Sequence, residues 1–438
     1  MSAETQTSAP APGARPQARS GRRRGAGRAA KASAPGRGPG REAWLRLGAC
    51  TGAAALLQLD GTLITVALPT VAHSLRVSGA ATSSVLSVYF LAYGIALPAG
   101  GMLVDRFGSR RLALLGLALF AAGAAGGALA GDIGALLATR VLQGAGAGLV
   151  SPAALAGAVS GFPPERRGAA LGIWGAASGV SNLAGPLLGG ALTVTLGWRA
   201  DWWGLVPLAA LSAFAIARFL PSIVHGESER SSQAVLRNGN VRAAALLASL
   251  TFAVMIGCFF LAEQYLQRSA HYSALAASGA LVLVAVLVGA AAPLAGRLSD
   301  RSGERMPLLA GFLAAALGLG ALGIPGVSLT SPLTILLLVP VGIGLGLLFV
   351  PTSRAALNST PAALHGRTSA VLSAGRLLGA ALGAGLAGLA LSAGTGADAV
   401  HHALLFACGA CLLIGLPAAA ALRPQPARAV PAEAPLAG

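Results

Sequence analysis

The stretch GMLVDRFGSRR, from Gly101 to Arg111, is a short charged link between two long apolar segments, and a related stretch, GRLSDRSGER, runs from Gly296 to Arg305. Four positions match at one constant spacing (296 − 101 = 195): Gly101 with Gly296, Asp105 with Asp300, Arg106 with Arg301, and Gly108 with Gly303. A repeat of this length indicates a duplicated architecture. The chain is therefore predicted to contain two related halves.

The composition predicts a membrane protein. Of the 438 residues, 55% are hydrophobic and 10% are charged, against about 25% charged in soluble domains, and the mean hydropathy is +0.72. Apolar runs of about 20 residues have the length of membrane-spanning helices, and their continuity favours helices over a β-barrel, whose strands alternate apolar and polar residues. We predict an all-α polytopic fold with about twelve spans, at roughly 47–69, 80–103, 111–130, 135–157, 168–194, 202–220, 243–264, 274–296, 307–325, 332–353, 367–392 and 402–422.

The positive charges predict the orientation. The net charge of +17 lies mainly in the N-terminal tail and in loops, which argues against nucleic-acid binding. Fourteen arginines fall in the links on the side of the N-terminus, whereas the opposite links carry only Arg76, Arg199 and Arg268. Since positive loops stay in the cytoplasm, both termini are predicted to be cytoplasmic, in a multi-pass protein of the cell membrane.

The spans and loops divide the chain into five parts. Residues 1–43 are predicted to be a disordered basic cytoplasmic tail, which is either an unselected Arg-rich segment or a lipid-binding one. Residues 44–220 and 242–422 are predicted six-helix halves, joined by a cytoplasmic linker at 221–241 and followed by a tail at 423–438. No removable signal peptide is evident. Parallel halves of this kind are related by a pseudo-twofold axis along the membrane normal, with substrate between them.

Four motifs carry a resemblance to a known family. The first link fits G-x-L-x-D-R-x-G-x-[KR], and LDGTLITVALP (59–69), RVLQGAGAG (140–148) and SNLAGPLLGG (181–190) lie in the first, fourth and fifth spans. Together they resemble the major facilitator superfamily, and within it the drug–proton antiporters. GWRADWWGLVP and FFLAEQYLQ are similar to the branch that usually has fourteen helices, although this chain lacks the two central ones.

The resemblance implies a secondary active transporter that exports a small organic compound, a drug or a self-made metabolite, in exchange for protons by alternating access. It implies no enzyme activity, a monomer, and no cofactor, with the proton gradient rather than ATP as energy source. An uptake carrier for a nutrient or chelated metal, and a non-transporting membrane sensor, are the alternatives. The GAGAG stretch lacks the GK[ST] of a phosphate loop, and the lone CxxC at Cys408 and Cys411 does not predict a metal site.

The repeated link is the predicted conformational latch, formed by Gly101, Asp105, Arg106, Gly108, Arg110, Asp300 and Arg301. The resemblance implies that Asp105 and Arg110 engage the opposite half when the cytoplasmic side is closed. The alternative is that the arginines only set the topology and the glycines only permit a tight turn. We favour the latch because an Asp recurs in both copies and topology requires none.

Charged residues within spans are costly and are functional candidates. Asp60 lies in the first span, where burial disfavours its charged form and suits reversible protonation, or where it is a structural hydrogen-bonding residue. Arg140, with Gln143 one turn later, is either part of proton coupling or a cation that extends to the nearby interface. We predict that Asp60 and Arg140 form the proton-coupling site.

Two further charges are possible substrate or ion-pair residues. Arg376 lies near the middle of the eleventh span and must face a carboxylate, backbone carbonyls or an anionic substrate. Glu263 falls at the predicted end of the seventh span, where solvation by water is expected. In the fifth span, Gly185, Pro186, Gly189 and Gly190 match the exporter motif, and helix packing alone would also account for the glycines.

Overall fold

The computed structural model describes residues 40–162, 167–221, 235–361, 364–393 and 396–423. In these segments all the regular elements are helices. The N-terminal half contains α1 (Arg41–Leu75), α2 (Gly79–Phe107), α3 (Ser109–Leu129), α4 (Ile133–Val159), α5 (Arg167–Leu196) and α6 (Arg199–Phe219).

The C-terminal half follows the same plan. Its helices are α8 (Gly239–Gln264), continued by the π-helix η2 (Tyr265–Ser269), α9 (Ala274–Ser302), α10 (Arg305–Leu322), α11 (Pro332–Asn358), α12 (His365–Ala393), and α13 (Ala397–Ala410), which continues through η4 (Cys411–Gly415) into α14 (Leu416–Ala420). Among the described residues, 11 helices are long and apolar enough to cross a membrane, and α5 occupies the remaining position, with an apolar part at Ala184–Leu196. The predicted all-α fold of about twelve spans is confirmed.

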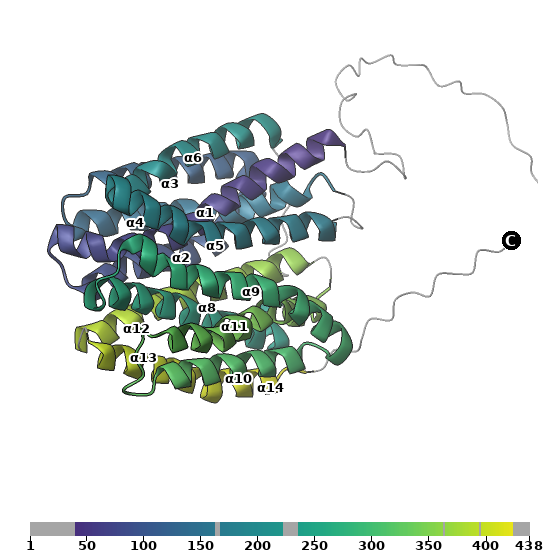
Figure 1. Cartoon of the computed structure of the whole chain (residues 1–438). Helices are drawn as coiled ribbons and strands as arrows, with labels where there is room; N and C mark the ends of the chain where they lie inside the picture. Colours follow the sequence, from purple (N-terminus) through teal and green to yellow (C-terminus); the bar gives the residue numbers. More distant parts are fainter. Residues whose placement is uncertain (1–39, 163–166, 222–234, 362–363, 394–395, 424–438) are drawn as a thin grey trace, which may run out of the picture.

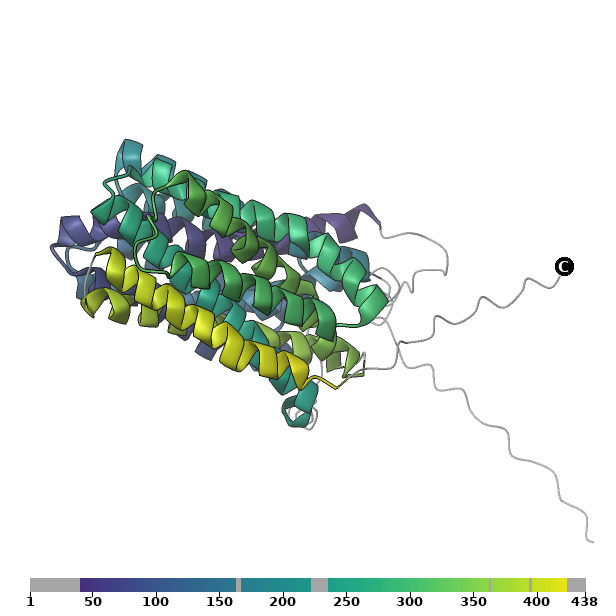
Figure 2. The same cartoon turned by 60° about the horizontal axis from the view of Figure 1, so that its bottom comes forward.

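The helices form two groups that lie side by side (Figures 1 and 2). Helices α1–α6 make one group and α8–α14 the other, and the groups meet where α2 contacts α12 and α5 contacts α9. Helix α1 begins and α14 ends at the same end of the bundle, which we call the termini end; the opposite end is the distal end. The predicted linker at 221–241 and both predicted tails lie largely outside the described residues.

The duplication extends to the helix caps. The hydroxyl oxygen of Ser78 accepts from the backbone N–H of Ala81 at the start of α2, and that of Ser273 accepts from Ala276 at the start of α9, both at 3.2 Å. These serines are again 195 residues apart (273 − 78 = 195). A serine in this position satisfies an otherwise unpaired N–H of the first helical turn, so the same local signal begins the second helix of each half.

Glycines set the helix spacing in both halves. Gly116 of α3 lies against Gly146 of α4, and Gly311 of α10 lies against Gly344 of α11. A Cβ atom at Gly146 would lie 2.5 Å from the carbonyl oxygen of Gly116, and one at Gly344 would lie 2.7 Å from that of Gly311. Small residues permit this close approach of helix backbones, which is the packing typical of membrane bundles.

Candidate functional site

A buried ion pair joins α1 to α4 inside the N-terminal half. Nη1 of Arg140 donates to both carboxylate oxygens of Asp60, at 2.9 and 3.0 Å, and to Oε1 of Gln143 at 2.9 Å. The side chains of Asp60 and Arg140 are both 0% exposed. Residues 80 positions apart in sequence thus form the polar cluster that we name the Asp60 cluster: Asp60, Arg140 and Gln143.

Helix α2 supplies the remaining contacts of the Asp60 cluster. Nε of Arg140 donates to the carbonyl oxygen of Val85 at 3.2 Å, and the guanidinium lies 4.0 Å from the centre of the Tyr89 ring. The Tyr89 hydroxyl in turn donates to the carbonyl oxygen of Leu57 at 3.2 Å. A charge held by a carboxylate, an amide, a carbonyl and an aromatic face is well compensated.

The burial of Arg140 decides between its two predicted positions. A cation that extended to the interface would be exposed, whereas Arg140 is fully buried and turned toward α1 and α2. The alternative of an interfacial Arg140 is therefore wrong, because a carboxylate on α1 offers compensation in the interior. Nη2 of Arg140 and Nε2 of Gln143 have no hydrogen-bond partner in the described part of the chain, so the cluster has spare donors.

The chemistry open to the Asp60 cluster follows from this pairing. Protonation of Asp60 would remove the charge that compensates Arg140, and breaking a buried pair costs about 3–5 kcal/mol. Proton uptake must therefore be accompanied by a rearrangement that brings another acceptor to the guanidinium, because the unpaired Nη2 of Arg140 and Nε2 of Gln143 are both donors. Such a linkage between protonation and side-chain position is what a coupling site requires.

Arg376 has a different environment. It lies on α12, half-buried, and its Nη2 donates to the hydroxyl of Ser353 on α11 at 2.8 Å. The guanidinium also lies 5.8 Å from the centre of the Phe252 ring of α8. No carboxylate among the described residues is within ion-pair distance of Arg376. Its described partners are a hydroxyl and an aromatic ring.

Glu263 connects to the boundary between the halves. Its Oε2 accepts from Nε2 of Gln267 at 2.6 Å, and the same Nε2 donates across the boundary to the carbonyl oxygen of Val66 on α1 at 3.0 Å. Glu263 is 0% exposed, so the expectation of solvation by water is wrong. The reason is that the helix continues through η2 to Ser269, beyond the predicted end at 264.

The repeated link forms the turn that its glycines predict. Gly108 ends α2 with φ 83° and Gly303 ends α9 with φ 73°, a backbone region that glycine adopts without strain. Asp300 accepts from Nη1 of Arg354 at 2.6 Å, within its own half. Arg106 and Arg301 are exposed and Arg110 is half-buried, while the side chain of Asp105 lies outside the described residues.

The exporter motif lies at two helix contacts. Gly185 and Gly189 of α5 lie against Thr62 and Leu63 of α1, next to Asp60, and Pro186 is buried between them. Gly190 faces the other half, where a Cβ atom would lie 2.7 Å from the hydroxyl of Ser278 on α9. These glycines therefore allow α5 to pack against both α1 and the opposite half. This agrees with the alternative that the glycines of the motif serve helix packing.

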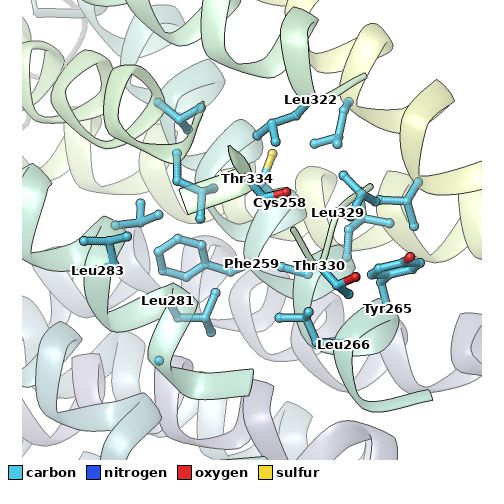
Figure 3. Close-up of a pocket in the computed structure, with 18 of the residues that line it drawn as sticks. Cys258, Phe259, Tyr265, Leu266, Leu281, Leu283, Leu322, Leu329, Thr330 and Thr334 are labelled. Atoms are coloured by element: carbon cyan, nitrogen blue, oxygen red, sulfur yellow. The ribbon is translucent and has the colours of Figure 1, made fainter. Parts of the chain in front are cut away.

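A cavity of about 430 Å³ lies inside the C-terminal half (Figure 3). Helices α8, α9, α10, α11 and α13 line it, mostly with apolar side chains, and Thr330 and Thr334 bring hydroxyls to it. The thiol of Cys258 is also at its wall. Within the described segments, no group of three or more His, Cys, Asp or Glu residues could hold a metal ion.

Sequence reasoning missed several members of these sites. Tyr89 and Val85 were not singled out, because contacts made through an aromatic face or a backbone carbonyl leave no charge signal within a span. Gln267 was visible only as part of FFLAEQYLQ. Its spacing of four residues from Glu263 places the two on one helix face, and this was the available signal.

Comparison with known proteins gives the family. The model of the Major Facilitator Superfamily matches residues 50–384 and, in a second match, 246–438. A POT family transporter whose crystal structure contains 5-aminolevulinic acid has the same fold, with a TM-score of 0.68 at 15% identity over 85% of this chain and 94% of that chain.

Three curated relatives are transporters. An uncharacterized MFS-type transporter of Mycobacterium tuberculosis is 38% identical over 185 residues, 42% of this chain and 32% of that protein, so the chain spans about a third of its length. The tetracenomycin C resistance and export protein of Streptomyces glaucescens is 28% identical over 81% of this chain and 77% of that protein. The riboflavin transporter RibZ of Clostridioides difficile is 25% identical over 78% and 87%.

The family match covers both six-helix groups and the Asp60 cluster between α1 and α4. It defines a multi-pass membrane transporter of small molecules rather than an enzyme, in agreement with the helical fold and the apolar spans. This chain belongs to the Major Facilitator Superfamily.

Proposed function

We propose that the protein exports a small organic compound from the cell in exchange for protons. The observation that carries this proposal is the Asp60 cluster, a carboxylate and a guanidinium paired at 2.9 Å with both side chains fully buried. Similarity to the tetracenomycin C resistance and export protein supports the outward direction. The energy source is the proton gradient, with no ATP or other cofactor, and the working unit is a monomer.

In the proposed cycle, charged Asp60 holds Arg140 as the structure has them. After the protein opens to the outside, a proton from that side neutralises Asp60, and Arg140 moves away from Asp60 while it keeps its bonds to Gln143 and to the Val85 carbonyl. Because Arg140 also bonds to the Val85 carbonyl of α2, its movement acts on the helix that packs against α12 of the other half. Loss of the proton to the cytoplasm then restores the ion pair.

The proposed orientation places the termini end in the cytoplasm. The bond from Gln267 to the Val66 carbonyl then lies on the outer side, where Gly190 also packs against α9. The state with these contacts is closed to the outside. The latch of the repeated link would form in the opposite state, through Asp105 and Arg110.

Transport into everted membrane vesicles tests the coupling. A pump-deficient host is first screened with antibiotics and dyes to choose a compound against which the gene protects. Vesicles with the wild-type protein should accumulate that compound only while a proton gradient is present. Asp60→Asn should abolish this accumulation and keep gradient-independent exchange of labelled for unlabelled compound, because binding does not need the proton.

Asp201→Asn is the matched control. Asp201 is also a buried carboxylate of the N-terminal half, but its described partner is the Thr193 hydroxyl at 2.7 Å rather than a cation, so its replacement should leave transport intact. Normal gradient-driven accumulation by Asp60→Asn would exclude the proposed coupling role.

The latch has its own test. Asp105→Asn should cripple transport while the protein still inserts into the membrane at the wild-type level. Unimpaired transport would reduce GMLVDRFGSRR to a topology signal.

An uptake carrier is the second candidate function, and similarity to the riboflavin transporter RibZ favours it. The two directions separate in one assay with radiolabelled riboflavin in intact cells. Gradient-dependent uptake by cells carrying the gene would favour the carrier, and exclusion of the label would favour export.

A further inference from the structure

Two arginines, Arg140 and Arg376, lie more than three residues from the ends of the predicted spans, and only Arg140 has its charge compensated by a carboxylate in the described structure. Arg140 is paired with Asp60, whereas Arg376 has the Ser353 hydroxyl and lies over the ring of Phe252. An uncompensated guanidinium at membrane depth is costly. Its retention in a transporter calls for an anionic partner that is not part of the described chain.

The acids nearest to Arg376 along the neighbouring helices are already engaged or distant. On α11, Ser353 is followed by Arg354, which takes Asp300 at 2.6 Å and lies 3.7 Å from Glu304. On α8, Glu263 is 11 residues beyond Phe252, or about 16 Å along the axis at 1.5 Å per residue. Glu263 is therefore too far along α8 to pair with Arg376 in this conformation.

The position of Arg376 on α12 faces the protein and not the lipid. Leu382 and Leu389 are 60% and 66% exposed and mark the outward side of α12. At 100° per residue, Arg376 is more than 100° around the helix from each of them. Its neighbour Leu377 packs against Gly94 of α2, so Arg376 lies at the level where the two halves meet.

The side chains around Arg376 also indicate which chemical group a bound anion would carry. Phe252 and Phe349 form an aromatic pair with ring centres 5.5 Å apart, beside the guanidinium. The Ser353 hydroxyl donates to the Phe349 carbonyl at 3.0 Å and accepts from Arg376, so it holds the guanidinium beside this aromatic pair. A planar ring bearing a carboxylate matches this combination of groups.

We infer that Arg376, with Ser353 and Phe252, is a binding site for an aromatic organic anion, and that the transported compound carries such a group. This inference rests on the proposed transport function and names its substrate class. The carboxylate would pair with the guanidinium and its ring would lie against Phe252.

Binding to the purified full-length protein tests the site without a gradient. A panel of aromatic acids, including 2-naphthoate, is compared with the matching neutral amides, such as 2-naphthamide, by the shift in Tm. At least one acid should raise the Tm of the wild-type protein while its amide does not. Arg376→Gln should weaken that acid at least tenfold, Arg376→Lys should weaken it less, and the Tm of each variant without ligand reports its folding.

The results separate this inference from the proposed function. If no acid stabilises the wild-type protein, or if Arg376→Gln binds the acid equally well, the anion site is wrong, whatever the vesicles show. If the acid binds through Arg376 but is not moved by a proton gradient, the site stands and proton-driven export fails. Gradient-driven export of cationic dyes that is unchanged in Arg376→Gln would leave export standing and overturn the inference.

Discussion

The two halves share one backbone plan and fill the same place with opposite chemistry. Helices α2 and α3 map to α9 and α10 at a spacing of 195 (311 − 116 = 195), and α4 maps to α11 at 198 (344 − 146 = 198), as the paired glycines show. At these spacings Tyr89, Arg140 and Gln143 correspond to Val284, Leu338 and Val341. All three of these apolar residues line the 430 Å³ cavity.

This difference indicates a division of labour. In the N-terminal half the space between helices is occupied by a charged cluster, and in the C-terminal half the same space is apolar and partly empty. The backbone scaffold does not require either filling, because the glycine contacts that set the helix spacing are present in both halves. At this place charge is therefore found in one half only, and the scaffold does not require it; the following variants test that statement.

The largest loss of stability is expected from removing one partner of the Asp60–Arg140 ion pair. Arg140→Leu leaves Asp60 buried without its cation and should destabilise the protein by about 3–5 kcal/mol. The double variant Asp60→Leu/Arg140→Leu makes this site resemble the C-terminal half and should recover most of that stability, while gradient-driven transport stays lost. Thermal unfolding in detergent measures the first effect and vesicle transport the second. A double variant less stable than Arg140→Leu would mean that the N-terminal half requires charge for its fold.

A smaller effect, equal in both halves, is expected at the shared glycines. Gly146→Ala and Gly344→Ala each place a methyl group against a neighbouring helix backbone, and overpacking of this kind costs about 1–3 kcal/mol. Gly101→Ala is the control, since a Cβ atom there has nothing within 4 Å. If only one of the two variants Gly146→Ala and Gly344→Ala lowered the Tm of the protein, the scaffold would be less symmetric than the glycine contacts suggest.

The smallest effect is expected from filling the cavity. Leu338→Phe adds apolar volume where space exists and should stabilise the protein by about 0.5–2 kcal/mol, the usual gain from cavity filling. Val150→Phe is the comparison variant in the packed half, where Val150 is 0% exposed, and it should destabilise the protein by about 1–3 kcal/mol. The two Tm shifts are expected to have opposite signs. A lower Tm of Leu338→Phe would contradict the claim that the cavity has room for a larger side chain at this position.

The fold was readable from sequence because hydropathy and turn signals are local. Apolar runs gave the twelve spans, and the glycines of the repeated link gave turns that the φ values of Gly108 and Gly303 confirm. The partner of Arg140 was not readable from spacing alone, because Asp60 comes from a helix 80 residues earlier, although both were named as one site. Glu263 was misplaced because the extension of α8 by a π-helix has no hydropathy signal. The cavity could not be predicted, since it depends on how apolar side chains of five helices fit together.

The bond from Gln267 to the Val66 carbonyl has an evolutionary consequence. Its acceptor is a backbone oxygen, so no substitution at position 66 removes that acceptor atom, and the contact survives drift on α1. A substitution can remove only the donor, the side chain of Gln267, which Glu263 holds in place. A link between the halves of this kind leaves no covarying pair in a set of related sequences, and it would be found by its geometry alone.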